Sequence, residues 1–190
     1  MKLYFNVIRR WWTVFVATAL LGLVSWSLGG TEIPVPGFMG GMVSMRVEYF
    51  APLLVIVAVL YCLDRRLEAP ESTAVVRLRR WDLAAVSLTA FLGHVLGLFV
   101  GMDIPRNLML LLAVALLVRQ FSNEAAAGGA CLLFLLATAS LGRNYRPSGQ
   151  PTGQWWALPL YPPGSLSAWV AALALFGCAL LLSGRRRRFR

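Results

Sequence analysis

Charged residues are scarce in this sequence: Asp, Glu, Lys and Arg together make up 14% of its 190 residues. Soluble domains carry about 25% charged residues, and disordered chains need low hydrophobicity with high net charge. Here 58% of the residues are hydrophobic, and the mean hydropathy is +0.68. These values exclude a water-soluble fold and predict an integral membrane protein.

Residues and motifs that carry catalysis are also missing. The chain has one histidine, His94, and its three cysteines, Cys62, Cys131 and Cys178, all lie inside apolar runs. It contains no glycine-rich phosphate loop, no HExxH zinc motif, no Gly-x-Ser-x-Gly elbow and no paired carboxylates within an apolar run. We therefore expect no enzyme activity, no metal or cofactor site on this chain, and buried, inert thiols.

The excess of positive charge has a topological explanation. Lysine and arginine total 18 against 8 acidic residues, which gives a net charge of +10. Nucleic-acid-binding proteins gather such residues into a patch, whereas here the arginines flank hydrophobic runs, as they do in membrane proteins. We expect contact with membrane lipid and no nucleic acid.

Six apolar runs approach the length of a transmembrane helix. A helix rises 1.5 Å per residue, so about 20 residues cross a hydrocarbon core of about 30 Å. The runs cover approximately residues 11–28, 47–63, 82–101, 104–121, 124–141 and 166–183. The fourth is the weakest, because it spans only if Arg106 and Arg119 snorkel to opposite interfaces. A re-entrant or tilted short helix is the alternative there.

The distribution of basic residues orients these runs. With both termini in the cytoplasm, fourteen of the eighteen basic residues face inward and four face outward. The opposite orientation would break the positive-inside rule. The sequence therefore predicts a single all-α transmembrane domain over residues 1–190, with six transmembrane helices and both termini cytoplasmic.

Two long segments, residues 29–46 and 142–165, are predicted to be extracellular. Met39, Met42 and Met45 recur at every third position of the first, which indicates a short interfacial helix; a methionine-rich binding surface is the alternative. The second carries Trp155 and Trp156, which form either an aromatic belt or a possible outer gate for a substrate.

The third apolar run holds the one ionisable residue near the middle of a predicted span. His94 lies within two overlapping G-x-x-x-G patterns formed by Gly93, Gly97 and Gly101. Such glycines let a neighbouring helix approach closely. We expect these four residues to form a helix-packing face, with an interhelical hydrogen bond to the imidazole. A titrating role and a polar contact along a substrate path are the alternatives.

The connection between the second and third runs, residues 64–81, has the signals of a short cytoplasmic helix. Pro70 and Glu71 suit a first helical turn, and Arg77, Arg79 and Arg80 suit a last turn, because these charges complement the helix dipole. Such a helix could face the bilayer surface or a partner protein. An arginine-rich loop that acts only as a topology signal is the alternative.

The same connection carries a resemblance to a known family. Its matching stretches are Leu63-Asp64-Arg65-Arg66-Leu67-Glu68, Glu71-Ser72-Thr73-Ala74-Val75-Val76-Arg77 and Arg79-Arg80-Trp81-Asp82. With six spans and internal termini, they resemble the type-2 exporter class of ABC-transporter permeases, which has the type V fold and a coupling helix between helices two and three. Small actinobacterial permeases look most similar, including around the stretch Trp155-Trp156-Ala157-Leu158-Pro159-Leu160.

The resemblance implies a permease subunit that moves a peptide, lipid-like or antibiotic-like substrate outward across a bacterial plasma membrane. ATP and magnesium would be held by a separate ABC ATPase subunit. That subunit would contact five charged residues of the coupling segment: Glu68, Glu71, Arg77, Arg79 and Arg80. A second permease copy or a paralogue would complete the transport path.

Two other functions remain open. One is the substrate-capturing subunit of an energy-coupling-factor importer, another class of six-span protein of about this size. The run at 11–28 offers Ala17, Ala19 and Gly22 for docking a scaffold, but no clear Ala-x-x-x-Ala repeat. The other is a non-transporting assembly or immunity subunit of a larger membrane complex.

Overall fold

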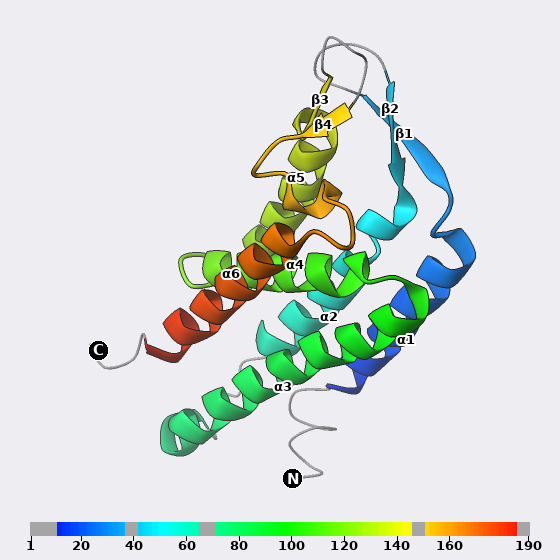
Figure 1. Cartoon of the computed structure of the whole chain (residues 1–190). Coiled ribbons are helices and arrows are strands. Elements are labelled where there is room, and N and C mark those ends of the chain that lie inside the picture. Colours follow the sequence, from blue (N-terminus) through cyan, green and yellow to red (C-terminus); the bar gives the residue numbers. More distant parts are fainter. Residues whose placement is uncertain (1–10, 37–41, 65–70, 146–150, 186–190) are drawn as a thin grey trace.

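The computed structural model describes residues 11–36, 42–64, 71–145 and 151–185, and six α-helices within these ranges form a bundle (Figure 1). The helices are α1 (Trp12–Leu28), α2 (Pro52–Asp64), α3 (Glu71–Val100), α4 (Asp103–Arg119), α5 (Glu124–Leu141) and α6 (Leu166–Arg185). Two antiparallel hairpins lie at one end of the bundle. They pair β1 (Glu32–Pro36) with β2 (Met42–Arg46), and β3 (Arg143–Tyr145) with β4 (Pro151–Gly153). Helix α1 begins and α6 ends at the opposite end (Figure 1).

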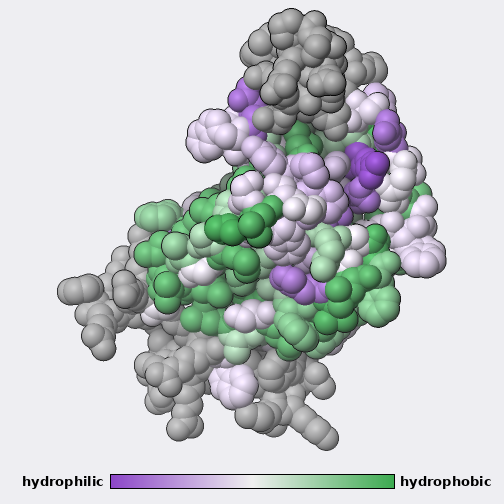
Figure 2. Space-filling model, viewed as in Figure 1, coloured by the Kyte–Doolittle hydropathy of each residue, from purple (hydrophilic) through white to green (hydrophobic). Residues whose placement is uncertain are grey.

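The bundle has the dimensions and surface of a membrane protein. In the described ranges, four helical segments are long and apolar enough to cross a bilayer: Val47–Asp64, Trp81–Val100, Glu124–Leu141 and Leu166–Gly184. Hydrophobic side chains cover the middle of the molecule, and hydrophilic ones gather nearer the hairpins (Figure 2). The predicted helical class is confirmed, whereas the six crossings and the cytoplasmic position of both termini stay predictions.

Helix α4 is the centre of the bundle and packs against α2, α3, α5 and α6. Twelve of its seventeen residues are buried, including Leu108, Leu111 and Leu112. By contrast, at most 44% of the residues in each of the four candidate spans are buried. The run with the weakest hydropathy signal therefore forms the protein core, where its neighbours are other helices and not lipid.

The first outer segment forms a hairpin, so the predicted interfacial helix is wrong. Glu32 pairs with Arg46 and Pro36 pairs with Met42, and the 3₁₀ turn η2 (Val47–Tyr49) leads into α2. Pro34 and Pro36 lack the N–H that a helix interior needs but are tolerated in a two-stranded ribbon. Side chains alternate between the two faces of a strand, so a spacing of three no longer marks one face, and Met45 is buried. Met39 lies outside the described residues.

The predicted short coupling helix is not separate from the third span. Helix α3 runs without a break for 30 residues from Glu71 to Val100, and its apolar segment begins at Trp81. No glycine or proline lies between Glu71 and Trp81 to end the helix at their junction. The first ten residues of α3 are therefore an extension of a helix whose apolar part is long enough to cross a membrane. Pro70 lies outside the described residues.

Candidate functional site

Arg106, near the start of α4, is fully enclosed by protein. Its side chain is 0% exposed, although the sequence predicted that it would snorkel to an interface. Nη1 donates to the carbonyl oxygen of Pro162 over 2.9 Å, and Nη2 donates to that of Pro159 over 3.1 Å. The predicted snorkelling is wrong for this residue, because backbone carbonyls of the outer segment take the place of water.

The partners of Arg106 are neutral. Nε and Nη2 both donate to Oδ1 of Asn107, each over 3.3 Å. Among the described residues no carboxylate forms an ion pair with Arg106, and the one such pair joins Arg46 and Glu48 over 3.2 Å at the surface. The Glu48 carboxylate raises the pKa of the Arg46 guanidinium by accepting its hydrogen bond and by its charge. The hydrogen bonds of Arg106 thus all go to neutral groups, and the nearby charge of Asp103 adds an electrostatic attraction.

A proline-rich turn supplies the carbonyls that Arg106 and a tryptophan bind. The 3₁₀ turn η3 (Leu158–Leu160) and the residues up to Pro163 close over the ends of α4 and α6. Its prolines have no N–H to donate, and the carbonyls of three of them accept hydrogen bonds from side chains of neighbouring helices. Trp169 of α6 donates its indole N–H to the carbonyl of Pro163 over 2.9 Å. Together with Arg106, it anchors the outer segment to the bundle.

His94 connects the same region to α3. Its Nδ1 lies 2.8 Å from the carbonyl oxygen of Ala90, one turn earlier in α3. Its ring centroid lies 5.6 Å from that of Trp169, with the ring planes at 47°. The predicted interhelical hydrogen bond to the imidazole is wrong: the hydrogen bond is internal to α3, and the interhelical contact is between two aromatic rings.

Two of the three predicted packing glycines face α4. A Cβ added to Gly93 would lie 2.5 Å from Cδ2 of Leu108, and one added to Gly97 would lie 2.6 Å from Cδ of Pro105. Gly101 differs, because it follows the end of α3 and an added Cβ would lie 2.8 Å from Oδ1 of Asp103. Close approach of the two helices therefore rests on Gly93 and Gly97, and Gly101 belongs to the turn.

At its other end, α4 is joined to the last turns of α2 and α6. Nη2 of Arg119 donates to the carbonyl oxygen of Leu63 over 2.7 Å. Nε2 of Gln120 donates to Oγ of Ser183 over 3.0 Å. Unpaired carbonyls at a helix end carry partial negative charge, which suits an arginine. An arginine at each end of α4 thus binds backbone carbonyls of another element.

The remaining predicted site residues are the two tryptophans of the outer segment and the charged residues of the coupling segment. Trp155 is 80% exposed between β4 and η3, and Trp156 is half-buried beside it. They lie in the same outer segment as the carbonyls that Arg106 binds. For Glu71, Arg77, Arg79 and Arg80 the structure describes the backbone, which belongs to α3, and Glu68 lies outside the described residues. In the described ranges, no three His, Cys, Asp or Glu side chains gather as a metal site would require.

No protein-family model, curated protein or solved structure matches this chain. The candidate site therefore rests on its own geometry: an outer turn bound by Arg106 and Trp169, two helices in close contact at Gly93 and Gly97, and the α3 extension.

Arg106, Asn107 and Trp169 form one cluster that the sequence pattern does not predict. A signal was present, because an arginine inside an apolar run is a candidate functional residue unless it lies near an interface. Trp169 gave no comparable signal, since tryptophans near the ends of apolar runs are common in membrane proteins. Its carbonyl partner depends on how the chain folds between residues 159 and 163.

Proposed function

We propose that this chain is the membrane-spanning subunit of an ABC exporter in a bacterial plasma membrane. A separate ATPase binds ATP and magnesium and acts on the α3 extension, and two permease chains, identical or paralogous, enclose the path. The cargo is a peptide, a lipid-like molecule or an antibiotic-like molecule that moves outward. The observation that carries the proposal is the continuity of α3 from Glu71 to Val100.

The length of α3 is what makes it suitable as a coupling element. At 1.5 Å per residue, its 30 residues extend about 45 Å, of which the apolar part, Trp81–Val100, accounts for about 30 Å. About 15 Å of helix therefore precedes the apolar part, and it projects beyond the neighbouring helices (Figure 1). Because no break separates the two parts, a displacement of the extension moves the whole helix.

The contacts of α3 lead from this extension to the outer segment. Gly93 and Gly97 lie against Leu108 and Pro105 of α4, so α3 cannot shift without repacking that helix. One residue after Pro105, Arg106 binds the outer turn. An ATPase that moves the extension would thereby change the outer segment, where Trp155 and Trp156 lie. This route from one end of the molecule to the other supports a transport cycle.

Co-purification of the ATPase tests the proposal. The affinity-tagged full chain, isolated from its native membranes, should retain a nucleotide-binding ABC ATPase that mass spectrometry identifies. Reversing two charges of the extension, by Glu71→Arg with Arg77→Glu, should remove the ATPase while the permease level stays constant. The matched control reverses Arg46→Glu with Glu48→Arg at the hairpin end and should retain it.

The opposite results contradict the proposal. Equal ATPase recovery from the two charge-reversed variants would leave the extension with no coupling role. A transmembrane scaffold of an energy-coupling-factor importer in place of the ATPase would favour the importer function.

A further inference from the structure

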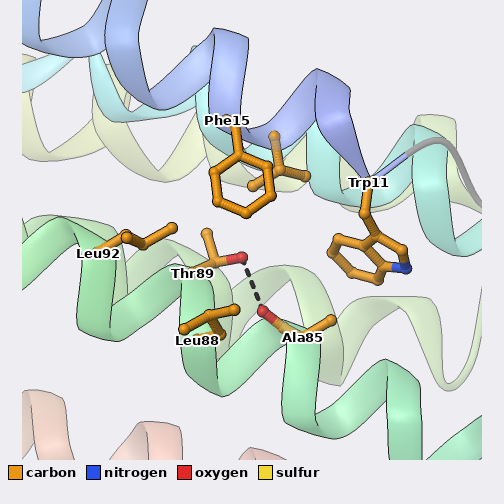
Figure 3. A pocket seen from close by; sticks show the side chains of 7 residues that line it. Trp11, Phe15, Ala85, Leu88, Thr89 and Leu92 are labelled. Atoms are coloured by element: carbon orange, nitrogen blue, oxygen red, sulfur yellow. Dashed lines mark hydrogen bonds between the residues drawn. The ribbon is translucent and has the colours of Figure 1, made fainter. Parts of the chain in front are cut away.

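A buried charge at the hairpin end of the bundle lies beneath a short surface segment. The recess where α1 lies beside α3 offers nothing comparable, because it is lined mainly by apolar side chains (Figure 3). The hydroxyl of Thr89 in that recess donates to the carbonyl oxygen of Ala85 over 2.8 Å within α3. At the hairpin end, Arg106 is fully buried and binds the carbonyl oxygen of Pro159 in η3. A movement of the segment around η3 therefore changes the exposure of a full positive charge.

Residues 155–164, which we call the outer lid, follow β4 and precede α6 (Figure 1). In the described ranges, no backbone hydrogen bond joins the outer lid to another helix or strand. Its own backbone hydrogen bonds each span three residues, over 3.0–3.3 Å: Ala157 donates to Gln154, Leu160 to Ala157, Tyr161 to Leu158, and Ser165 to Pro162. The outer lid is therefore a compact unit whose main chain is attached to the bundle only where it begins and ends.

Three side-chain hydrogen bonds hold the outer lid against the helices. Arg106 donates to the carbonyl oxygens of Pro159 and Pro162 over 3.1 and 2.9 Å. Trp169 donates to the carbonyl oxygen of Pro163 over 2.9 Å. Both donors belong to helices, so these bonds can break without disrupting the backbone hydrogen bonds of any helix or strand.

The two ends of the outer lid allow it to turn. Gly164 is exposed just before α6, and a Cβ added to it would have no atom within 4 Å. At the other end, Gly153 is the last residue of β4. Hinges are a few positions at the ends of elements, and glycine adopts more backbone conformations than other residues. A rotation of the outer lid about these two positions leaves α6 and β4 intact.

Opposing contributions to the free energy act on the closed position. The hydrogen bonds and the burial of Ala157 and Pro159 favour it. The burial of Arg106 opposes it, because removing a charge from water is costly and its hydrogen bonds in the described residues go to neutral acceptors. The attraction of Asp103 offsets this cost in part. Opening would return the guanidinium to water, which compensates for the hydrogen bonds that are lost.

We propose that the outer lid opens and closes over Arg106, and that Arg106 and Trp169 are its latch. In the closed position the guanidinium is enclosed, and in the open position it faces water at the hairpin end. Trp155 and Trp156 belong to the outer lid and move with it. The opening requires neither an ATPase nor nucleotide, so the purified chain tests it independently of the proposed function.

Modification of Arg106 by phenylglyoxal measures the opening. The purified full chain in detergent is treated with the reagent, and peptide mass spectrometry gives the rate at each arginine. Arg46 should react fast, since its side chain is 58% exposed. Arg106 should react slowly but measurably, because the reagent reaches it only while the outer lid is open. Cys131, which is buried in the middle of α5, should stay protected from maleimide over the same time.

Two variants should shift the rate at Arg106 in opposite directions. Trp169→Phe keeps an aromatic ring but removes the N–H of the latch, and it should raise the rate about fivefold. Gly164→Ala fits without a clash and reduces the conformational freedom of the open lid, so it should lower the rate about twofold. The matched controls are Trp26→Phe, at a position that is 78% exposed, and Gly177→Ala, where an added Cβ likewise meets no atom within 4 Å. Both controls should react as the original chain does.

Three outcomes overturn the proposal. The first is no reaction at Arg106 while Arg46 is fully modified, since the outer lid would then stay closed. The second is reaction of Arg106 in step with Cys131, which would show that the whole bundle unfolds. The third is an equal rate in Trp169→Phe and Trp26→Phe, which would leave Trp169 without a role in the latch.

The glycine pair decides the question if Trp169→Phe lowers the yield of folded protein. Equal rates at Arg106 in Gly164→Ala and Gly177→Ala would then overturn the hinge and with it the lid. Loss of ATPase co-purification leaves all these outcomes unchanged, so failure of the lid and failure of the proposed function are distinguishable.

Discussion

The guanidinium of Arg106 donates a hydrogen bond over 2.9 Å to the carbonyl oxygen of Pro162, 56 residues later in the chain. This bond joins the central helix to the outer segment in the interior, where water cannot replace it. Removing the guanidinium therefore takes a buried donor from the carbonyl of Pro159, whereas the carbonyl of Pro162 keeps the backbone N–H of Ser165. The stability of the outer segment and that of the helix core are linked at this point.

Arg106→Lys should destabilise the protein although it keeps the positive charge. A lysine ammonium is compact and cannot reproduce the planar fork that reaches Pro159, Pro162 and Asn107 together. We expect the free energy of unfolding in detergent to fall by about 1–3 kcal/mol. Arg46→Gln is the matched control, since Arg46 is 58% exposed and should change the stability by about 0.5 kcal/mol or less. Equal losses would show that Arg106 has no special structural role.

Gly97→Leu should separate α3 from α4. Its first side-chain atom would lie 2.6–2.7 Å from two carbons of the Pro105 ring, which is fixed in the first turn of α4. We expect a loss of about 1–3 kcal/mol in the free energy of unfolding, as for other overpacked cores. Gly177→Leu introduces the same residue in α6 where no atom lies within 4 Å, and it should be nearly neutral. Thermal unfolding of both variants in one detergent makes the comparison.

His94 and Trp169 should show an energetic coupling that depends on the aromatic rings. His94→Leu removes the ring contact and should cost about 0.5–1.5 kcal/mol, whereas His94→Phe should retain most of it. A double-mutant cycle with Trp169→Leu measures the coupling. A coupling near zero would assign the 5.6 Å approach of the rings to simple proximity.

The same residue allows a test of proton coupling. If His94 serves only in packing, His94→Gln should preserve the pH dependence of transport in reconstituted vesicles. If the imidazole carries a proton in the cycle, that dependence should disappear in His94→Gln and His94→Leu at equal protein levels. Loss of the pH dependence in both variants would contradict the packing role.

Cysteine labelling should determine the orientation. In a background without Cys62, Cys131 and Cys178, a cysteine at Thr31 should react with an impermeant maleimide in intact cells. One at Arg190 should react only after permeabilisation. The reason is the fourteen-to-four distribution of basic residues across the predicted spans. The reverse pattern would contradict the predicted topology, and outside labelling of both sites would indicate an odd number of crossings.

The sequence predicts helix positions well where apolar runs end at polar residues. The run 124–141 coincides with α5, because Asn123 caps the helix by accepting a hydrogen bond from the backbone N–H of Ala126 and Glu124 lies in the first turn. The hairpin formed by β1 and β2 differs from the interfacial helix that the methionine spacing predicts, and Pro34 and Pro36 are the residues that favour the hairpin. Prolines restrict the backbone directly, whereas the spacing of side chains depends on what they pack against.

The role of α4 could not be obtained from hydropathy. Hydropathy measures how well a helix suits lipid, but α4 is enclosed by four other helices and need not suit lipid at all. Its Arg106 is satisfied by carbonyls more than 50 residues away, and no local pattern encodes such a contact. By contrast, Gly93 and Gly97 were recognisable, because a close helix approach demands small residues at a fixed spacing whatever the partner is.

Both arginines of α4 bind main-chain oxygens, and every amino acid supplies the same main-chain oxygen. Substitutions at Leu63, Pro159 and Pro162 therefore keep the carbonyl acceptors of Arg119 and Arg106, as long as the local backbone path is kept. Replacing either arginine, however, removes the donor itself. The outer segment can thus change its side chains while the helix beneath it continues to hold it in place.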